Sequence, residues 1–580
     1  MRLSYQHANP STGGGSYLLR FRDATRERTA CVLVDSGVGV DIDSLLADDE
    51  YLVAVLLTHA HLDHYASLAD SLRDGARVYA AEPTANVLEH VLTEGEKNYE
   101  IGTTDGVLDA VEPLDGWETL VADVAVSPVP AGHAPGASGF VVRFGDGSRT
   151  NHLLFTGDFT TRRVAGYPGF RTELPVDIDA LFVNVSTADD FEKTLSESLF
   201  TLVERAQAGS SVLATASALT AVHYAYLLGH LGERLGDPIP VTLAGQCAKL
   251  YADLGYDVPN VEAVPVFDSA SDLLERGTVT FAGPEVPTEG SARRLFGVVE
   301  GDSAATLVQL TGGATTPVDT ATCTVYDFEV VNHPSLSAID ELVEEFDPIH
   351  VVAGHGPRHA LRNFRGRYDE RFVWASDDER EQILYEGGRW SPPPWLSETA
   401  VQSIRARDWR ANGARFGDLA ERDESLPAVV RVADPELGAE GVEVERLEDR
   451  FGERDDSTHS TARSTQTEGK EAASKAADTE AGERRPDESE TSEPEAIEPE
   501  AAESGLSDSS VPDAAVTETE RFRREVLGRL DDLEPRATGA RLRARVVDGG
   551  DDVTLLRLLD ETDLEHGEEV TVVLTESEDE

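Results

Sequence analysis

The segment Thr58-His59-Ala60-His61-Leu62-Asp63-His64 directly follows the apolar run Leu52–Leu57. A short aliphatic run that ends in polar residues predicts a buried strand with a polar loop at its C-terminal end. Three imidazoles and a carboxylate within six positions suit Zn²⁺ or a similar borderline metal. In an extended loop the first two histidines point to one side, while the last two residues, at the following turn, address a second point nearby. Histidine occupies only 15 of 580 positions, so this clustering is improbable by chance. We predict that the segment contributes to two neighbouring metal positions.

Further ligands are expected where other apolar runs end. Each of three such runs lies next to one ligand-type residue: His133 in the small-residue loop before a strand, Asp158 after the run 152–155, and His355 after the run 349–353. Taken singly, each fits a solvated turn histidine or a helix-capping aspartate. Their shared position at strand ends, in this order after the 58–64 segment, favours a role as additional ligands.

The pattern over residues 1–375 predicts a layered α/β protein, because short apolar runs alternate with amphipathic segments. Within it, residues 187–330 repeat the alternation on their own and predict a compact insertion with a parallel sheet. The helices expected there cover 195–206 and 218–234, and the strands 211–215, 239–243, 279–281 and 306–310. After the insertion we expect a helix over 335–346 and a strand over 349–353.

The remainder of the chain changes in composition. Residues 376–450 are polar, and Pro392–Trp395 is expected to form a docked or extended segment. Residues 451–515 are dominated by Glu, Asp, Ser, Thr, Ala and Pro, which predicts a disordered acidic linker. Residues 516–580 predict a small αβ module, with a helix near 516–533 and strands near 541–547, 553–558 and 569–574.

The charge of the chain is strongly acidic. There are 50 Lys and Arg against 109 Asp and Glu, a net charge of −59. Such acidity normally argues against a nucleic-acid partner. However, the acids are dispersed and lysine occurs only five times, a pattern typical of salt-adapted (halophilic) proteins whose carboxylates hold hydrated cations. Net charge is therefore a poor guide to the substrate of this protein.

Cysteine usage and hydropathy indicate the compartment. Cys31, Cys247 and Cys323 are scattered and odd in number, which excludes a disulfide framework or a cysteine-rich zinc ribbon and fits a reducing cytoplasm. The first residues show no signal pattern, and no apolar run approaches the length of a membrane span. We therefore expect a cytoplasmic protein with no membrane association.

At this point a resemblance can be stated. Asp35-Ser36-Gly37, the 58–64 segment, His133, Asp158 and His355 resemble, in this order, the motifs of the metallo-β-lactamase hydrolase fold. The insertion resembles the β-CASP domain of the nucleic-acid-processing branch: the ribonuclease J enzymes, the cleavage-and-polyadenylation endonucleases and their archaeal homologues in mRNA 3′-end processing. The resemblance implies an αββα sandwich formed by 1–185 and 331–375, with the β-CASP domain inserted at 186–330.

The resemblance also implies a site. One zinc would be held by His59, His61 and His133, and a second by Asp63, His64 and His355, with Asp158 bridging the ions and Asp35 behind them holding a ligand histidine. Two Zn²⁺ are the expected cofactors, with Mn²⁺ as the alternative. Asp63, Asp158 and His333 would be catalytic, His333 contacting the scissile phosphate and assisting the leaving group. Arg162, Arg163 and Ser335 are candidates for substrate contacts.

The implied activity is two-metal hydrolysis of phosphodiester bonds in RNA, internally, from the 5′ end, or both. RNA-directed members carry a histidine at the position of His355, which favours RNA as the substrate. The family tendency towards dimers makes a homodimer one expectation, and the C-terminal module is expected to bind a protein partner.

The sequence departs from the family at two places. The usual acid before Ser-Thr is Val185, for which Asp189 or Asp190 are the candidate replacements, and the aspartate two positions after His333 is Ser335. These departures leave two alternatives open: a catalytically weak scaffold subunit of an RNA-processing complex, and a metallo-hydrolase acting on a small ester, thioester or cyclic phosphate.

Overall fold

The computed structural model divides the chain into two units, Met1–Arg463 and Ser464–Glu580. The residues that it describes are 1–23, 28–99, 101–147, 149–313, 315–356, 358–375, 379–415, 425–451, 544–548 and 554–558. In the second unit the described residues form an antiparallel pair, β22 (Ala544–Asp548) and β23 (Thr554–Leu558). Both lie where the sequence predicted strands. The predicted linker, the helix near 516–533 and the strand near 569–574 lie outside the described residues.

The first unit contains two large sheets packed face to face. The first sheet has the order β21-β20-β1-β2-β3-β4-β5-β6 and the second the order β19-β18-β11-β10-β9-β8-β7. The strands of the first sheet are β1 (Arg2–His7), β2 (Tyr17–Arg22), β3 (Thr29–Val34), β4 (Glu50–Leu57), β5 (Arg77–Ala81), β6 (Val111–Leu114), β20 (Gln382–Glu386) and β21 (Arg389–Trp390). Those of the second are β7 (Glu118–Val121), β8 (Val124–Pro130), β9 (Ser138–Asp146), β10 (Arg149–Phe155), β11 (Ala180–Asn184), β18 (His350–Gly354) and β19 (Phe372–Ala375).

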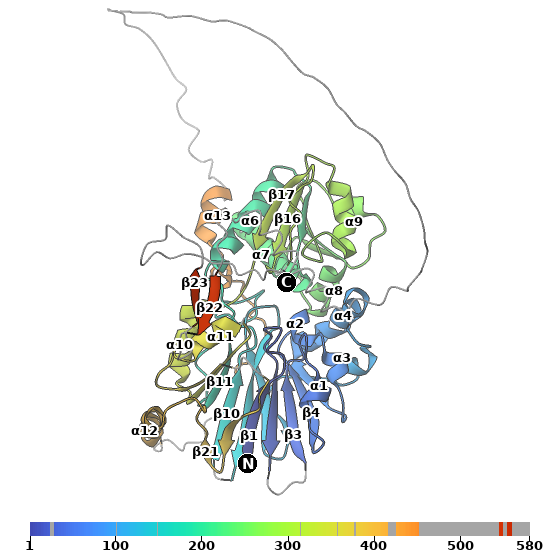
Figure 1. The fold of residues 1–580 in the computed structure, drawn as a ribbon. Coiled ribbons are helices and arrows are strands. Elements are labelled where there is room, and N and C mark those ends of the chain that lie inside the picture. Colours follow the sequence, from blue (N-terminus) through green and yellow to red (C-terminus); the bar gives the residue numbers. More distant parts are fainter. Residues whose placement is uncertain are drawn as a thin grey trace, which may run out of the picture. The chain divides into compact units, whose positions relative to one another are not determined.

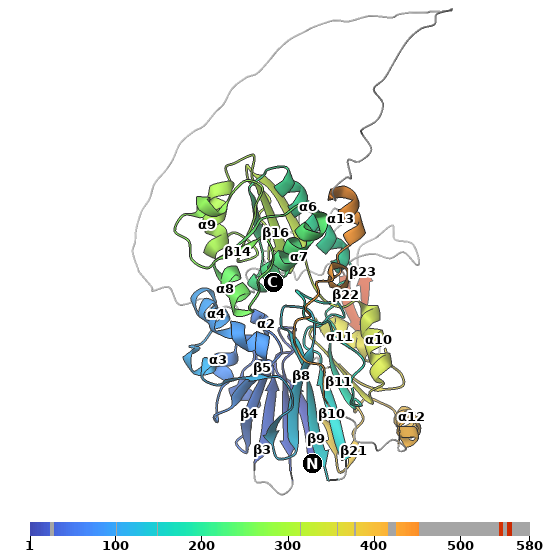
Figure 2. The ribbon, with the colours of Figure 1, turned by 180° about the vertical axis from the view of Figure 1, so that it is seen from behind.

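Helices cover the outer faces of these sheets (Figures 1 and 2). On the side of the first sheet lie α1 (Ile42–Leu45), α2 (Leu62–Tyr65), α3 (Leu68–Ser71), α4 (Glu82–Asn98) and α5 (Asp105–Leu108), and on the side of the second α10 (Leu336–Phe346) and α11 (Arg358–Phe364). This is the αββα sandwich that the sequence predicted, so the fold class is confirmed.

The central strands read as continuous apolar runs because both of their faces are buried. In β3, Val32 and Val34 belong to the core between the sheets, whereas Cys31 and Leu33 belong to the core under the helices. The alternation follows from the two-residue period of a strand. Burial on both faces explains why β4, which precedes the 58–64 segment, could be predicted from its apolar sequence.

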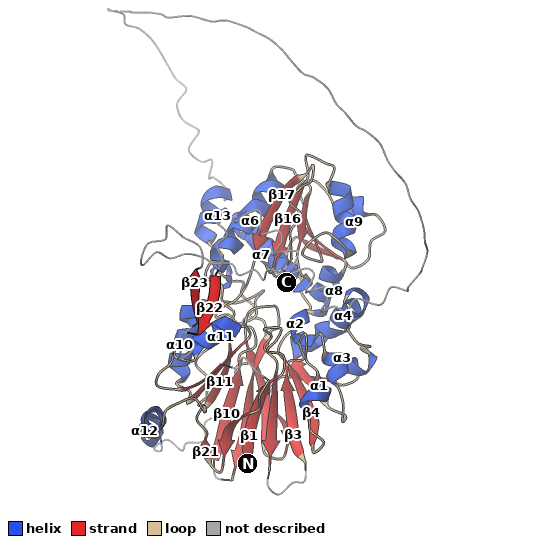
Figure 3. Cartoon of the chain, in the orientation of Figure 1, coloured by secondary structure: helices blue, strands red, loops and turns tan. Residues whose placement is uncertain are grey.

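The insertion forms a second α/β layer structure on a six-stranded sheet (Figure 3). Its order is β14-β13-β15-β12-β16-β17, and all its pairs are parallel. The strands are β12 (Val212–Thr215), β13 (Val241–Ala244), β14 (Val261–Val264), β15 (Val279–Ala282), β16 (Thr306–Thr311) and β17 (Thr324–Glu329). The helical elements are α6 (Phe191–Gln207), α7 (Ala218–Leu235), α8 (Gln246–Asp253), the 3₁₀ turn η1 (Ala270–Leu273) and α9 (Gly290–Val299). The predicted parallel sheet is therefore present.

Residues after 375, expected to form a polar extension, contribute to the folded unit instead. β20 pairs antiparallel with β1 and extends the first sheet. Trp395 of the proline-rich segment packs edge-on against Trp374, with ring centroids 5.6 Å apart. Beyond it lie α12 (Glu398–Arg415), the 3₁₀ turn η2 (Leu437–Glu440) and α13 (Val444–Phe451). The contact of Trp395 agrees with the docked segment expected at Pro392–Trp395, whereas β20 and β21 were not expected because they are short and the region is polar.

Two further sequence expectations concern features that the described residues test directly. Cys31, Cys247 and Cys323 are buried free thiols. Within the described ranges, no helix combines the length and apolar character needed to cross a bilayer.

Candidate metal centre

The predicted ligands lie at one edge of the sandwich because the strands that carry them run in the same direction. β10 and β11 are parallel, as are β11 and β18, and β8 is related to β10 through two antiparallel pairings. In the first sheet β3 and β4 are parallel. The carboxyl ends of these strands therefore meet at a common edge, where the loops after β3, β4, β8, β10 and β18 carry Asp35, the 58–64 segment, His133, Asp158 and His355.

Three of these residues have left-handed backbone conformations. The φ angles of Asp35, His133 and His355 are 55°, 59° and 54°. Such values are uncommon outside glycine, and they concentrate at functional sites where the surroundings hold a strained turn in place. Close packing adds a further constraint, since a Cβ on Gly37 would lie 1.9 Å from the carbonyl oxygen of Asp63.

Asp35 fixes the orientation of two imidazoles from a buried position. Its Oδ2 accepts a hydrogen bond from His64 Nδ1 at 2.8 Å and one from the hydroxyl of Thr58 at 2.9 Å. That hydroxyl in turn accepts from His59 Nδ1 at 3.1 Å. In both rings Nδ1 therefore carries a proton, and Nε2 is the nitrogen that faces the centre and can bind a metal once it carries none. This is the orienting contact expected behind ligand histidines.

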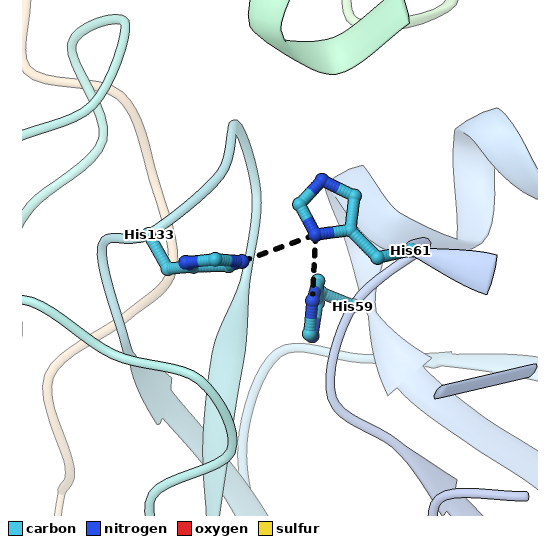
Figure 4. A group of neighbouring side chains, drawn as sticks. All are labelled: His59, His61 and His133. Carbon is cyan, nitrogen blue, oxygen red and sulfur yellow. Dashed lines mark hydrogen bonds between the residues drawn. The ribbon is translucent and has the colours of Figure 1, made fainter. Parts of the chain in front are cut away.

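The first group of converging atoms consists of three imidazole nitrogens (Figure 4). His59 Nε2 lies 3.0 Å from His61 Nδ1, which lies 3.1 Å from His133 Nε2. Three nitrogens bound tetrahedrally at the Zn–N distance would be about 3.3 Å apart. Two of the three spacings are therefore close to that of ligands of one zinc ion, and all three nitrogens lie within 4.8 Å of one another.

The second group contains Asp63, His64, Asp158 and His355. His64 Nε2 lies 3.7 Å from Asp63 Oδ2 and 3.5 Å from Asp158 Oδ2. The Nε2 atom of His355 lies 3.9 Å from Asp63 Oδ2. These atoms come from the same loop as the first group and from the ends of β10 and β18.

The carboxylate of Asp158 lies between the two groups. Its Oδ2 is 3.5 Å from His64 Nε2 and 3.7 Å from His133 Nε2, so one oxygen faces a ligand of each group. Its Oδ1 accepts a hydrogen bond from Asn184 Nδ2 and lies 2.9 Å from His355 Nδ1. This is the geometry of a carboxylate able to bridge two cations.

Burial and charge divide the imidazoles into two classes. Burial, reinforced by neighbouring imidazoles, lowers the pKa of His59 well below its ordinary value, and burial lowers that of His133 to about 3. Burial also acts to lower the pKa of His64, but the surrounding carboxylates, Asp158 first, raise it well above its ordinary value. The pKa of His355 is likewise raised, because Asp158 outweighs the effect of burial.

The same charges act on the shared carboxylate. Burial by itself would raise the pKa of Asp158, but the imidazoles around it, His355 and His64 first, hold it well below the ordinary range. Asp158 is therefore ionised at neutral pH and supplies negative charge at the middle of the centre.

The residues present fit a pair of divalent cations. The Nε2 atom of His64 is buried and has no hydrogen-bond partner among the described residues, although two carboxylate oxygens lie 3.5 and 3.7 Å from it. A buried polar atom without a partner is costly, and metal coordination would satisfy it. Imidazoles with a few carboxylates are the donor set that zinc and related borderline metals prefer.

His333 borders the centre on the side of the insertion. Its Nε2 lies 3.4 Å from Asp158 Oδ2, and its Nδ1 is 2.8 Å from the hydroxyl of Ser186. With His133 and Asp158 it forms a third set of converging donor atoms. The ring therefore faces the region where a substrate at the metal centre would lie.

The neighbouring Asn332 locks the loop of His133 to this segment. His133 Nδ1 donates to the backbone carbonyl of Asn332 at 2.9 Å, and Asn332 Nδ2 donates to the carbonyl of His133 at 2.7 Å. The guanidinium of Arg162 donates to Asn332 Oδ1 at 3.1 Å and to the carbonyl of His333 at 3.0 Å. Arg162 thus lies next to the site and supports it.

Several candidates from the sequence lie elsewhere. Arg163 pairs with Glu436 at 3.1 Å, and Ser335 accepts from the backbone N–H of Ala338 as the N-cap of α10. Neither contributes to the three groups of converging atoms. Asp189 and Asp190 are exposed in the turn before α6. Neither of these two acids takes the place of the missing acid at Val185 beside His333. The residue that contacts His333 is Ser186, whose hydroxyl lies 2.8 Å from Nδ1 of the ring.

Four further residues of the site, Thr58, Asn184, Ser186 and Asn332, were not predicted from the sequence. Thr58 begins the 58–64 segment, Asn184 and Ser186 flank Val185, and Asn332 precedes His333. Their closeness to these positions was the one feature of the sequence that could have indicated a role. Their residue types gave no such indication, because hydroxyl and amide side chains are common in loops. Their contacts join residues that are separate in the sequence, from 23 positions for Thr58 and Asp35 to 199 for Asn332 and His133.

Comparison with known proteins agrees with this geometry. Residues 15–195 match the family model of the metallo-beta-lactamase superfamily. The chain is 30% identical over 186 residues to a probable metallo-hydrolase of Streptococcus pyogenes serotype M6, an alignment covering 30% of this chain and 70% of that relative. The chain belongs to the metallo-beta-lactamase superfamily. Asp35, the 58–64 segment, His133 and Asp158 lie within the matched residues, whereas His333 and His355 lie beyond them.

Two other superfamily relatives carry ribonuclease names. Ribonuclease TTHA0252 of Thermus thermophilus is 32% identical over 223 residues, covering 36% of this chain and 50% of the relative. Endoribonuclease YSH1 of Mycosarcoma maydis is 28% identical over 177 residues, covering 26% of this chain and 19% of the relative. The chain therefore matches half of the length of the first relative and a fifth of the second.

Proposed function

We propose that this protein is a metal-dependent ribonuclease of the β-CASP branch, hydrolysing phosphodiester bonds in RNA with two divalent cations, zinc being the first candidate. The observation that carries the proposal is the shared carboxylate of Asp158, which faces both groups of converging ligands. The ribonuclease names of the two superfamily relatives support RNA as the substrate.

When bound, a pair of such ions lowers the pKa of a water molecule and neutralises charge on the phosphate oxygens. The chain's own residues provide the rest. Asp35 and Thr58 hold the ligand rings in one tautomer, and Asp158 supplies a negative charge shared between the two groups. His333, oriented by Ser186, faces Asp158 and is placed to donate a hydrogen bond to a phosphate oxygen or a proton to the leaving oxygen.

The test uses the purified full chain, loaded with zinc or manganese, on end-labelled linear RNA and on a circular RNA of the same sequence. We expect cleavage of the linear RNA, and cleavage of the circle if the enzyme cuts internally. Asp63→Ala and His355→Ala are expected to lower kcat/KM by at least about 100-fold with the fold retained. Asp48→Asn, an exposed acid in the loop before β4, is the matched control and should leave the rate unchanged.

Intact RNA in the presence of two bound ions per chain would contradict the proposal. Turnover of a thioester or a small phosphodiester by the same preparation would then identify a small-molecule hydrolase. Absence of both activities would favour the scaffold interpretation.

A further inference from the structure

Residues 425–451, which we call the strap, connect the sandwich to the insertion. Near the sandwich loop 163–166, the N–H of Arg163 donates to the carbonyl of Ala439, and the N–H of Val432 donates to that of Gly166, both at 2.9 Å. On the insertion side, Glu443 N donates to Ser196 Oγ of α6 at 2.9 Å. The last part of the strap, α13, lies beside α6 in both views (Figures 1 and 2).

Within the strap, Glu440 is a completely buried acid. Its Oε2 accepts from the N–H of Ala165 at 2.7 Å and its Oε1 from that of Gly166 at 2.8 Å. The third partner is Nε2 of His223 on α7, which lies 2.9 Å from Oε2. A carboxylate that accepts from two backbone donors requires that His223 Nε2 also donate, so the proton of this ring is held on Nε2.

The remaining nitrogen of His223 is uncommitted. Among the described residues Nδ1 forms no hydrogen bond, and the side chain of His223 is 6% exposed. The residue lines a pocket together with the metal-centre imidazoles His61 and His133. The lining of the same pocket includes the apolar residues Val164, Phe191, Leu219 and Val330.

We propose that His223 contacts the ribose 2′-hydroxyl of a nucleotide bound at the metal centre, and that Glu440 is the residue that positions it. The inference rests on the proposed ribonuclease function and assigns a contact that would distinguish RNA from DNA. The 2′-hydroxyl both donates and accepts, so it complements Nδ1 with or without a proton.

The role of Glu440 makes the strap part of the site. Changing the acid to glutamine replaces one acceptor by an NH₂ group of almost the same size. That group would meet either a backbone N–H or the Nε2–H of His223, so one hydrogen bond is lost or the ring changes its tautomer or orientation. Glu440→Gln should therefore alter what Nδ1 presents to the pocket without emptying the site.

The experiment measures kcat/KM of the metal-loaded full chain for an all-ribose oligonucleotide and for a set in which one 2′-deoxynucleotide is moved through the cleavage site. Equilibrium binding of the same set is measured by fluorescence anisotropy on metal-free protein, which cannot turn over. Removal of the 2′-hydroxyl at one position should reduce kcat/KM and affinity of the wild type by roughly fivefold to tenfold.

His223→Ala and Glu440→Gln should abolish this ratio by weakening the all-ribose substrate only, leaving values for the deoxy substrate within about twofold. His230→Ala is the matched control, since His230 lies on the same helix with its own acidic neighbour Glu233 and outside the pocket lining. Metal content and thermal unfolding report whether each variant folds. If Glu440→Gln does not fold, His223→Gln, which leaves the carboxylate with its two backbone donors, takes its place.

The inference is overturned if His223→Ala discriminates between ribose and deoxyribose as well as the wild type does. It is also overturned if His230→Ala loses the ratio to the same extent. Failure of the proposed function looks different, because the wild type would then cleave none of the oligonucleotides.

Discussion

At the scale of single residues, the properties of the centre depend on which ring nitrogen carries the proton. Asp35 determines this for His64 directly and for His59 through Thr58. Neither histidine could present Nε2 as a ligand if its proton moved there. Asp35 therefore determines which ring nitrogens face the centre without itself being one of the converging ligands.

Asp35→Asn tests this argument. The amide keeps the size of the side chain but places an NH₂ group either against the backbone N–H of Thr58 or against the two donors at Oδ2, so at least one hydrogen bond that Asp35 accepts is lost and the side chain is displaced from the rings it orients. We expect zinc affinity to fall by about 10–100-fold, measured by competition with a chromogenic chelator. Asp48→Asn, exposed and away from the ligands, should bind zinc as the wild type does. Equal affinities for all three proteins would contradict the assigned role.

The pKa shifts predict that acid removes metal from the two groups at different pH values. His59 and His133 have lowered pKa values and are neutral ligands well below pH 6.5, whereas His64 and His355 have raised pKa values and must each release a proton to bind. As the pH falls, the second group therefore loses affinity first, by up to about 100-fold per pH unit for two displaced protons.

Zinc titrations of the wild type at pH 8, 7 and 6 measure this difference. Two ions per chain are expected at pH 8, and one of them should weaken steeply by pH 6. In His355→Ala, binding of the weaker ion displaces one proton fewer. The affinity of that site should therefore change less steeply with pH than in the wild type. If the affinities for both zinc ions fall equally as the pH is lowered, the two groups of ligands do not differ in pKa as their surroundings imply.

The residues that sequence analysis could and could not find differ in their chemistry. Metal ligands come from few residue types, so His59 and Asp63 stand out in a chain with little histidine. Asn332 and Glu440 act through backbone groups of residues distant in sequence. The residues next to them in the sequence do not indicate such contacts. The contacts form only when the chain folds and brings β8, β17 and the strap together.

At the scale of elements, burial on both faces made the central strands predictable. The run Leu52–Leu57 lies within β4, and the expected helix over 218–234 matches α7 almost residue for residue. β20 and β21 were missed because they are short, with five and two residues, and several of their side chains are polar or exposed. Strands pair through backbone atoms, which leave little trace in the residue types of such short segments.

Ser335 illustrates how an element can explain a residue that looked functional. Its Oγ accepts from the N–H of Ala338 at 3.2 Å and caps α10. Ser335→Ala should lower the free energy of unfolding by about 1 kcal/mol, measured by urea denaturation, with kcat/KM on RNA unchanged. Ser335→Asp, which retains a capping oxygen, should restore the stability. If Ser335→Ala lowers activity by more than it lowers the fraction of folded protein, Ser335 contacts the substrate as the sequence predicted.

At the scale of the whole molecule, the first unit is assembled from segments far apart in the chain. The sandwich closes only when β18, β19 and β20 return after the insertion, and the strap then bonds to both parts. The metal centre depends on this closure, because His355 follows β18 and His333 precedes α10. Ligand convergence is therefore a measure of complete folding.

The net charge of −59 makes the stability of the whole chain dependent on salt. Repulsion among dispersed carboxylates opposes the compact state, and raising the ionic strength from 0.1 to 1 M shortens the screening length from about 10 to about 3 Å. We expect Tm to rise by roughly 5 °C over this range of KCl, equivalent to about 1–3 kcal/mol. Sucrose at matched osmolality is the control, because it stabilises by exclusion without screening charge and should give a smaller rise. A Tm that stays constant or falls as KCl increases would remove the case for salt adaptation, and the acidity would then need an explanation in binding.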